Sequence, residues 1–120
     1  MDKIFIDGLH ARCILGVDAE ERRERQDVIV SVALRADVRT AGASDCFEDA
    51  VDYRVIKKRI LAMMEDSSFQ LVEAMAEQVA GICLEHPKVL EVQVRVEKPT
   101  ALRFARSVGV EITRGRGDLA

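Results

Sequence analysis

A lysine at the end of a predicted β-strand is the first side chain in this sequence that could do chemistry. In the segment VLEVQVRVEKP, residues 89–99, polar residues alternate with the apolar Leu90, Val92, Val94 and Val96. This period of two is typical of a strand with one buried face. Lys98 continues the apolar phase, and Pro99 ends the strand because it has no backbone donor. The ammonium can reach solvent on its long stem, or it can stay partly desolvated and act as a base.

Three other polar sites could take part in chemistry, and each also has an ordinary structural explanation. Glu73 falls in the first turn of a predicted helix, where it could grip a ligand or simply complement the helix dipole. Tyr53, the only tyrosine, stands at the start of another predicted helix, where its ring could equally be packing. The Glu20–Glu21 pair lies in a charged connection that could be a solvated surface. None of these signals is specific alone.

Composition excludes several classes of protein. The 120 residues are 48% hydrophobic and 32% charged, which predicts a single folded domain, 1–120. The net charge of −3 argues against nucleic-acid binding, and no apolar run is long enough to cross a membrane. The start, MDKIFIDG, does not resemble a signal peptide.

The cysteines and histidines predict a cytoplasmic protein without a metal site or cofactor. Cys13, Cys46 and Cys83 are odd in number and far apart, as expected of free thiols in a reducing compartment. His10 and His86 are isolated, so nothing in the sequence has metal-ligand spacing.

Alternating apolar residues predict four strands. The first covers residues 3–15 with a bulge at Gly8, and the second covers residues 28–38 after the charged connection. Residues 89–99 form the third strand. The fourth should turn Val108, Val110 and Ile112 inward, and residues 113–120 should be a frayed tail.

Two helices are predicted between the second and third strands. Residues 40–52 are expected to form a loop, with Asp52 capping the first helix. Ser67 and Gln70 fit a capping box for the second. The apolar stripes are Ile56, Ile60, Met63 and Met64 in the first helix, and Val72, Met75, Val79, Ile82 and Cys83 in the second. This ββααββ order predicts an α+β fold, a four-stranded antiparallel sheet with two antiparallel helices on one face.

Four segments together resemble the dihydroneopterin aldolase family, which has the tunnelling fold. They are GVDAEERRERQ (16–26), DAVDY (49–53), FQLVEAMAE (69–77) and VEKPTALRFARSVGVEI (96–112). They occur in the order that the family has, and the similarity covers nearly the whole chain. The spacing from Gly16 to Glu21 to Gln26 also matches the family.

This resemblance implies a 7,8-dihydroneopterin aldolase of folate biosynthesis, an aldehyde-lyase that needs neither a metal nor a Schiff base. Lys98, Glu21 and Tyr53 are implied to be catalytic, with Lys98 as general acid and base working with Glu21 through an ordered water. The pterin substrate is implied to bind Glu73, Leu71, Val72, Val51, Glu21 and Tyr53, with Leu71 and Val72 acting through their backbone.

The resemblance also implies an assembly. Family members form rings of four whose sheets close into one β-barrel, and these rings commonly stack into octamers. We therefore expect a homo-tetramer or homo-octamer with active sites at subunit interfaces, where Tyr53 comes from the neighbouring subunit. The sequence does not decide between the two assemblies.

Two alternative functions stay open at this stage. A dihydroneopterin triphosphate 2′-epimerase shares the four implied residues, and ERRERQDVIV (21–30) and ALRFARSV (101–108) resemble that branch. Arg103 and Arg106 could meet a triphosphate or could be surface arginines. The other alternative is a non-catalytic tunnelling-fold protein that binds a pterin or purine, for which the Glu73 anchor would suffice.

Overall fold

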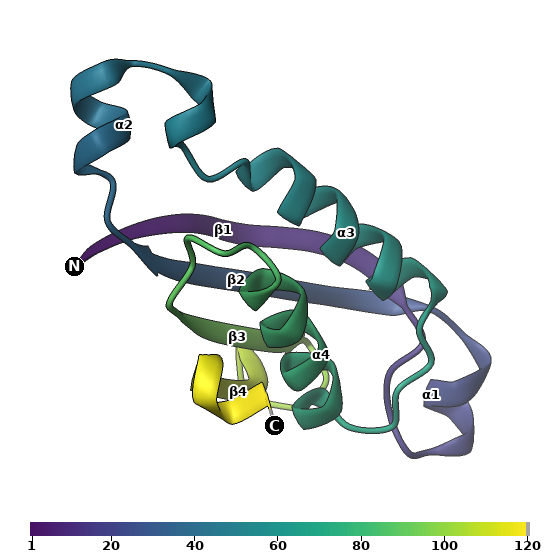
Figure 1. Cartoon of the computed structure of the whole chain (residues 1–120). Coiled ribbons are helices and arrows are strands. Elements are labelled where there is room, and N and C mark those ends of the chain that lie inside the picture. Colours follow the sequence, from purple (N-terminus) through teal and green to yellow (C-terminus); the bar gives the residue numbers. More distant parts are fainter. Residues whose placement is uncertain (120) are drawn as a thin grey trace.

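A four-stranded antiparallel sheet carries two helices on one face in the computed structural model, which describes residues 1–119 (Figure 1). The strands β1 (Asp2–Cys13), β2 (Gln26–Ala36), β3 (Glu91–Pro99) and β4 (Ser107–Gly115) lie side by side in sequence order. The two long helices are α3 (Tyr53–Asp66) and α4 (Val72–Leu84), and both fall between β2 and β3. The predicted α+β fold and ββααββ order are therefore confirmed.

The core lies between the sheet and the two helices. Alternate residues of the central strands are buried there, since β2 contributes Val28, Val30, Val32 and Leu34, and β3 contributes Val92, Val94 and Val96. Helix α3 buries Ile56, Ile60 and Met64, and α4 buries Met75, Val79, Ile82 and Cys83. Complete burial of each such large side chain contributes roughly 1.5–3 kcal/mol. This core fixes the positions of β3 and α4, which carry Lys98 and Glu73.

The predicted bulge at Gly8 is confirmed. The pairing of β1 with β2 shifts register between Ile6 and Leu9, and Gly8 has φ of +74°. The backbone N–H of Gly8 donates to Ser31 Oγ at 2.9 Å, so this unpaired group is satisfied. Glycine suits the position because a side chain would make this backbone conformation strained.

Two segments that we predicted to be loops contain short helices. The charged connection forms α1 (Ala19–Arg23), with Glu20 and Glu21 in its first turn and Arg22 and Arg23 in its last. Acids at the start of a helix and bases at the end complement its dipole, and the sequence order already contains that signal.

Residues 40–52 are also more ordered than the predicted loop. They include most of α2 (Arg39–Ser44) and the 3₁₀ turn η1 (Phe47–Asp49). The Asp37 side chain accepts from the backbone N–H of Arg39 at 3.0 Å, which satisfies one free donor at the start of α2. Glycine and serine in this segment had suggested irregular structure.

The helix caps were predicted correctly at one position and wrongly at another. Asp52 caps α3, because its side chain accepts from Arg54 N at 3.1 Å. The capping box of Ser67 and Gln70 is wrong. Ser67 instead ends α3, with its hydroxyl donating to Met64 O at 2.7 Å, and α4 begins at Val72 without a side-chain cap.

The prediction of a frayed tail over residues 113–120 is wrong for the part of the chain that the structure describes, and residue 120 lies outside that part. Strand β4 continues to Gly115 and pairs with Glu91. The turn η2 (Arg116–Leu119) follows, and the Arg116 guanidinium donates to Leu84 O at 3.0 Å and His86 O at 2.6 Å. These bonds attach the end of the chain to the end of α4.

Two predicted inward side chains are exposed. Leu90 is 46% exposed because β3 begins only at Glu91, and the buried side chain before the strand is Val89. Val108 is 37% exposed because it lies at the rim of a pocket, whereas Val110 and Ile112 pack against the core. Within residues 1–119, none of the helices combines the length and the apolar character needed to span a membrane.

Candidate active site

A pocket of about 310 Å³ lies where α1, the start of α4 and the β3–β4 hairpin meet. These segments lie together at one end of the molecule (Figure 1). Four polar side chains line the pocket, Glu21, Gln70, Glu73 and Lys98. Its apolar lining comes from Val17, Leu71, Val72, Val108 and Val110. Five of the predicted site residues, Glu21, Leu71, Val72, Glu73 and Lys98, are thus brought together.

Two other hollows lack these side chains. A hollow of about 250 Å³ on the sheet face opposite the helices includes Asp7, Ser31 and Arg95. A groove of about 480 Å³ between α3 and α4 includes Arg59, Asp66 and Glu77. Both have charged linings, but neither contains any residue that the sequence marked for chemistry.

Lys98 and Glu21 form a direct ion pair inside the pocket. Lys98 Nζ donates to Glu21 Oε2 at 2.7 Å, and the two side chains are 13% and 27% exposed. Lys98 therefore does not extend into open solvent. The pair joins the end of β3 to α1 across 77 positions of sequence.

The surroundings of Glu21 favour its charged form. The hydrogen bond from Lys98 lowers the pKa of the Glu21 carboxyl below its usual range, against the opposing effect of burial. Gln26 Nε2 adds a weaker contact to the same oxygen at 3.5 Å and also donates to the backbone oxygen of Leu15. Glu21 is therefore held as a carboxylate from two sides.

Glycine at position 16 makes room for the Glu21 side chain. A Cβ on Gly16 would lie 2.3 Å from Glu21 Cδ, and the residue has φ of +147°. Gly16 also donates its N–H to Phe69 O at 3.1 Å, which ties this turn to the segment before α4. The Gly16–Glu21 spacing seen in the sequence thus reflects a close contact.

Glu73 occupies the first turn of α4, as predicted. Leu71 is the N-cap residue and supplies no side-chain cap, so the first N–H groups of the helix are free to bind another acceptor. Glu73 and Leu71 are both exposed at the pocket. A ligand there can meet a carboxylate that accepts hydrogen bonds beside backbone groups that donate them.

Tyr53 and Val51 are not part of this pocket within one chain. Tyr53 begins α3 and is 55% exposed, while Val51 is buried just before it. The 14 residues of α3 make a helix of about 21 Å, and its other end is the one nearer the pocket. A single subunit therefore leaves these two predicted site residues distant from Lys98.

Gly109 also lines the pocket, and nothing in the sequence indicated its importance. A Cβ there would lie 1.8 Å from the Val96 backbone oxygen, so Gly109→Ala should prevent β4 from pairing beside Lys98. We expect a loss of more than about 4 kcal/mol in the free energy of unfolding, measured by urea denaturation, or insoluble protein.

The matched control for this prediction is Gly81→Ala. Gly81 lies in α4 with no atom within 4 Å of an added Cβ, so alanine should stabilise the helix by up to about 1 kcal/mol. Equal stability of the two variants would contradict the close approach of β3 to β4 at Gly109.

The comparisons with known proteins agree with one another. The family described as "FolB: Dihydroneopterin aldolase" matches residues 4–113. A dihydroneopterin aldolase of Streptomyces coelicolor is 39% identical over 101 residues, which cover 84% of this chain and 85% of that protein. A dihydroneopterin triphosphate 2′-epimerase of Pseudomonas aeruginosa is 33% identical and covers 97% of this chain and 94% of its own length.

A solved structure shows the same fold. The crystal structure of Escherichia coli dihydroneopterin aldolase in complex with neopterin superposes with a TM-score of 0.91 at 33% identity. The superposition covers 96% of this chain and 100% of the other. A four-stranded antiparallel sheet with helices on one face, arranged in this way, is the tunnelling fold. The chain belongs to the dihydroneopterin aldolase family.

Proposed function

We propose that this chain is a 7,8-dihydroneopterin aldolase that acts in folate biosynthesis. It cleaves the substrate to 6-hydroxymethyl-7,8-dihydropterin and glycolaldehyde. The observation that carries the proposal is the direct Lys98–Glu21 pair in the same pocket as Glu73, because one end can move protons while the other binds a ring. The 39% identical aldolase of Streptomyces coelicolor supports the same activity.

Glu73 anchors the pterin. A pterin ring presents a ring N–H and a 2-amino group on one edge, and a carboxylate can accept from both in a charge-assisted pairing. The backbone groups of Leu71 and Val72 meet the other polar ring atoms at the start of α4. The pocket of about 310 Å³ is at the small end of the usual range for ligand sites, which suits a single compact ring system.

The substrate itself supplies the electron sink for the bond that breaks. A base removes the proton of the 2′-hydroxyl, the C1′–C2′ bond breaks, and glycolaldehyde leaves. The electron pair moves into the conjugated N5–C6 imine of the ring, and the resulting enol is protonated at C1′ to give the hydroxymethyl product. On this route the protein needs neither a Schiff base nor a metal.

Lys98 moves the protons in this scheme, since its neutral amine accepts the 2′-hydroxyl proton and the resulting ammonium returns a proton to C1′. It is enclosed in the pocket, so water competes weakly for its ammonium group, and its hydrogen bond to Glu21 fixes the position of that group. Glu21 balances the charge of Lys98 and orients it. A positioned acid or base typically contributes about 10² to 10⁴-fold to the rate.

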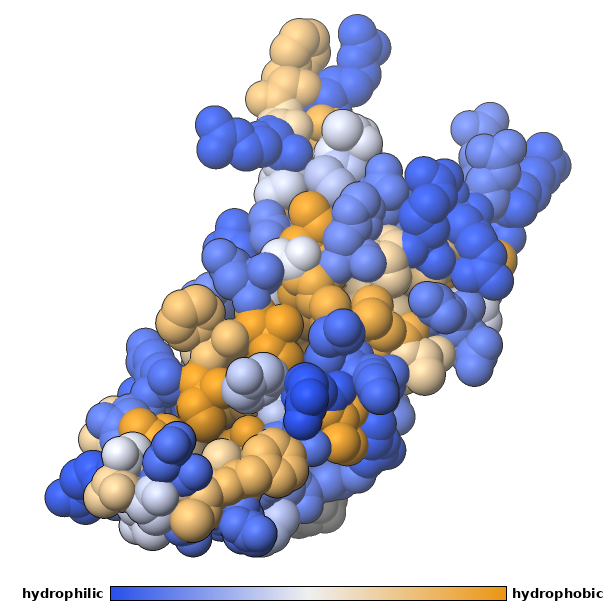
Figure 2. Space-filling model, turned by 90° about the horizontal axis from the view of Figure 1, so that it is seen from above, coloured by the Kyte–Doolittle hydropathy of each residue, from blue (hydrophilic) through white to orange (hydrophobic). Residues whose placement is uncertain are grey.

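Tyr53 completes the site from a neighbouring subunit in the assembly that we propose. Strands β1 and β4 form the two edges of the sheet, and pairing the β4 edge of one copy with the β1 edge of the next would close a ring. Exposed apolar side chains near the start of α3, including Phe47 and Val55 beside Tyr53, suit a contact with another copy. Figure 2 shows hydrophobic residues gathered between hydrophilic ones on the face seen from above.

A mixing experiment tests the shared site. Homomers of Lys98→Ala and of Tyr53→Ala should each lack turnover, because every site then misses one group. After the two proteins are unfolded and refolded together, about a quarter of the interfaces combine an intact Lys98 with an intact Tyr53, and that share of the activity should return. Activity no higher than that of the separate homomers would contradict a site that takes Lys98 and Tyr53 from neighbouring subunits.

The triphosphate epimerase is the second candidate. Arg103 and Arg106 lie in the exposed connection between Pro99, the last residue of β3, and Ser107, the first of β4. Neither forms an ion pair to a carboxylate within residues 1–119. Guanidinium groups of this kind suit phosphate oxygens. The 33% identical epimerase of Pseudomonas aeruginosa supports the same candidate.

The decisive experiment incubates the purified protein separately with 7,8-dihydroneopterin and with its triphosphate. The oxidised pterins are then separated by chromatography. 6-Hydroxymethylpterin from the unphosphorylated substrate establishes the aldolase. Isomerised triphosphate without cleavage establishes the epimerase instead, and tight pterin binding without either product leaves a binding protein.

A further inference from the structure

We propose that Arg22 is a positioning residue that holds the Glu21 side of the pocket against the Glu73 side. The proposal rests on the proposed function, because it concerns how Glu21 and Glu73 are positioned relative to each other in that site. Arg22 is half-buried on α1, immediately after Glu21. It is not itself among the residues that line the pocket.

The geometry places one nitrogen of Arg22 between two backbone carbonyls. Arg22 Nη1 donates to Gly16 O at 3.2 Å and to Phe69 O at 3.1 Å. Phe69 O also accepts from Gly16 N at 3.1 Å, so both acceptor positions of that carbonyl are used. Two of these bonds end on Phe69 O and join residues 16–22 to the segment that leads into α4, and the third joins Arg22 to the turn at Gly16.

Helix α1 depends on such contacts because it has few of its own. It is only five residues long, has no buried residue, and its N-cap Asp18 makes no side-chain cap bond. A helix of this length is only marginally stable without tertiary contacts. Among residues 1–119, side-chain contacts that fix it from the rest of the chain include the Arg22 bonds, the Lys98–Glu21 pair and the weaker Gln26–Glu21 contact.

The Glu73 side of the pocket is anchored in the core, whereas the Glu21 side is not. Glu73 belongs to α4, whose Met75, Ala76 and Val79 are buried in the core, so its position does not depend on Arg22. Glu21 belongs to the uncapped α1. Loss of Arg22 should therefore displace Glu21 and the group it orients, Lys98, while ring binding at Glu73 largely persists.

Arginine suits this role better than a smaller donor. Its planar guanidinium carries paired hydrogens that can meet two carbonyls at once, and its charge does not need a carboxylate to make those bonds. Among residues 1–119 no ion pair of Arg22 with an acid is found, unlike Arg12, Arg59 or Arg114. Its hydrogen bonds go to the backbone that shapes the site.

The test compares Arg22→Ala with Arg23→Ala, a matched control at the next, exposed position of α1. We expect kcat of Arg22→Ala to fall by about 10²-fold, since a displacement near 1 Å can cost that much. The Kd for neopterin should change by less than about tenfold, and Arg23→Ala should resemble wild type. Equal effects of the two variants would overturn the proposal, as would parallel losses in kcat and binding for Arg22→Ala.

A second measurement needs no turnover. Hydrogen exchange followed by mass spectrometry should show faster exchange across residues 16–24 in Arg22→Ala than in wild type or Arg23→Ala. Unchanged exchange there would overturn the proposal. Wild-type protein without aldolase turnover would overturn the proposed function alone, because the exchange comparison still tests the contact.

Arg22→Lys keeps the charge and a donor but loses the planar group, so its losses should lie between those of wild type and Arg22→Ala. This variant gives the same comparison if Arg22→Ala proves insoluble. Wild-type kcat and wild-type exchange in Arg22→Lys and in any soluble Arg22→Ala would show that the guanidinium does not position the site.

Discussion

The variant Lys98→Met is expected to lose turnover of 7,8-dihydroneopterin by at least about 10² to 10⁴-fold, the contribution of one acid–base group. Methionine keeps much of the volume of the lysine stem, so the pocket should keep its shape. Neopterin should still bind, because the ring is held by Glu73 and the start of α4. The measurements are kcat by product chromatography and Kd by fluorescence titration.

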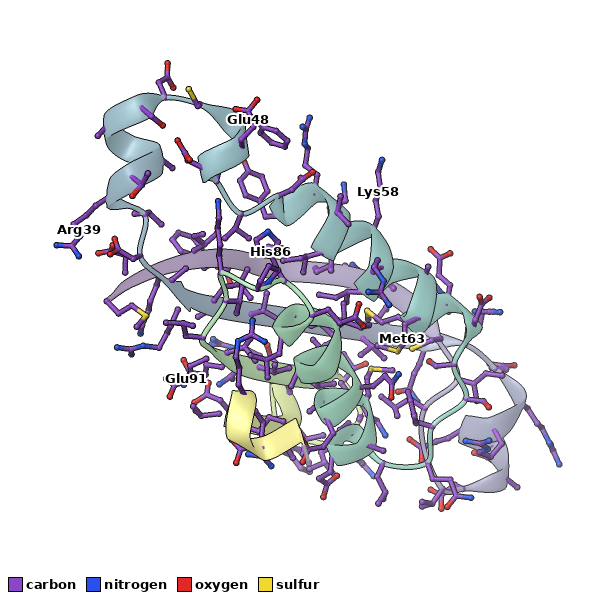
Figure 3. All side chains as sticks on the ribbon, viewed as in Figure 1. Arg39, Glu48, Lys58, Met63, His86 and Glu91 are labelled. Carbon is purple, nitrogen blue, oxygen red and sulfur yellow. The ribbon has the colours of Figure 1, made fainter. Side chains whose placement is uncertain are left out.

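A matched lysine controls for the loss of a positive charge. Lys58 lies on the exposed side of α3 and points away from the body of the protein (Figure 3), so Lys58→Met should retain wild-type kcat. Near-normal turnover in Lys98→Met would remove Lys98 from the chemistry. A large loss of binding with unchanged kcat would instead make it a binding residue.

The same variant has a predicted pH signature. The pKa of Glu21 is lowered in the folded protein, chiefly by the hydrogen bond from Lys98. A carboxyl whose pKa is lower in the folded protein stabilises the fold at pH values above its ordinary pKa of 4.5. That stabilisation is lost as the pH falls through the pKa of the folded state. On acidification below that range, wild type should therefore lose more stability than Lys98→Met.

The sheet was predictable because its signal is local and strict. Alternation along residues 28–36 and 92–96 required one buried face, and the structure buries those side chains. Lys98 was found in the same way, since its phase in β3 pointed it toward the helices. A glycine out of phase at position 8 correctly indicated the bulge.

The rest of the site depends on contacts that no local pattern records. The Lys98–Glu21 pair joins residues 77 positions apart, and the Arg22–Phe69 bond joins residues 47 apart. Backbone carbonyls such as Phe69 O carry no side-chain signature, so Arg22 looked like one charge among many. The importance of Gly109 likewise came from a backbone approach across two strands.

The false capping box shows how a correct rule can fail. Ser67 and Gln70 have the right spacing, but the Ser67 hydroxyl bonds backward to Met64 O and ends α3. The start of α4 is therefore left without a side-chain cap. At a ligand site this is informative, because a side-chain cap would occupy one of the N–H groups that can otherwise be offered to a ring.

Glu73→Gln should produce the opposite pattern to Lys98→Met. Glutamine is the same size but replaces one acceptor oxygen by an NH₂ group, so it cannot accept from both the ring N–H and the 2-amino group. Hydrogen bonds to a charged group are worth about 1.5–3 kcal/mol, so the Kd for neopterin should rise by about 10- to 100-fold. The kcat at saturating substrate should fall much less, because Lys98 and Glu21 are untouched.

Glu91→Gln is the control for this prediction, because Glu91 begins β3, at the other end of that strand from Lys98, and its carboxylate pairs with Arg35 at the surface. Its Kd and kcat should match wild type. If Glu73→Gln bound neopterin as tightly as Glu91→Gln, the carboxylate would not be the ring anchor. If it bound normally but turned over slowly, Glu73 would belong to the proton-transfer end, and the division of the pocket into a binding end and a chemical end would be wrong.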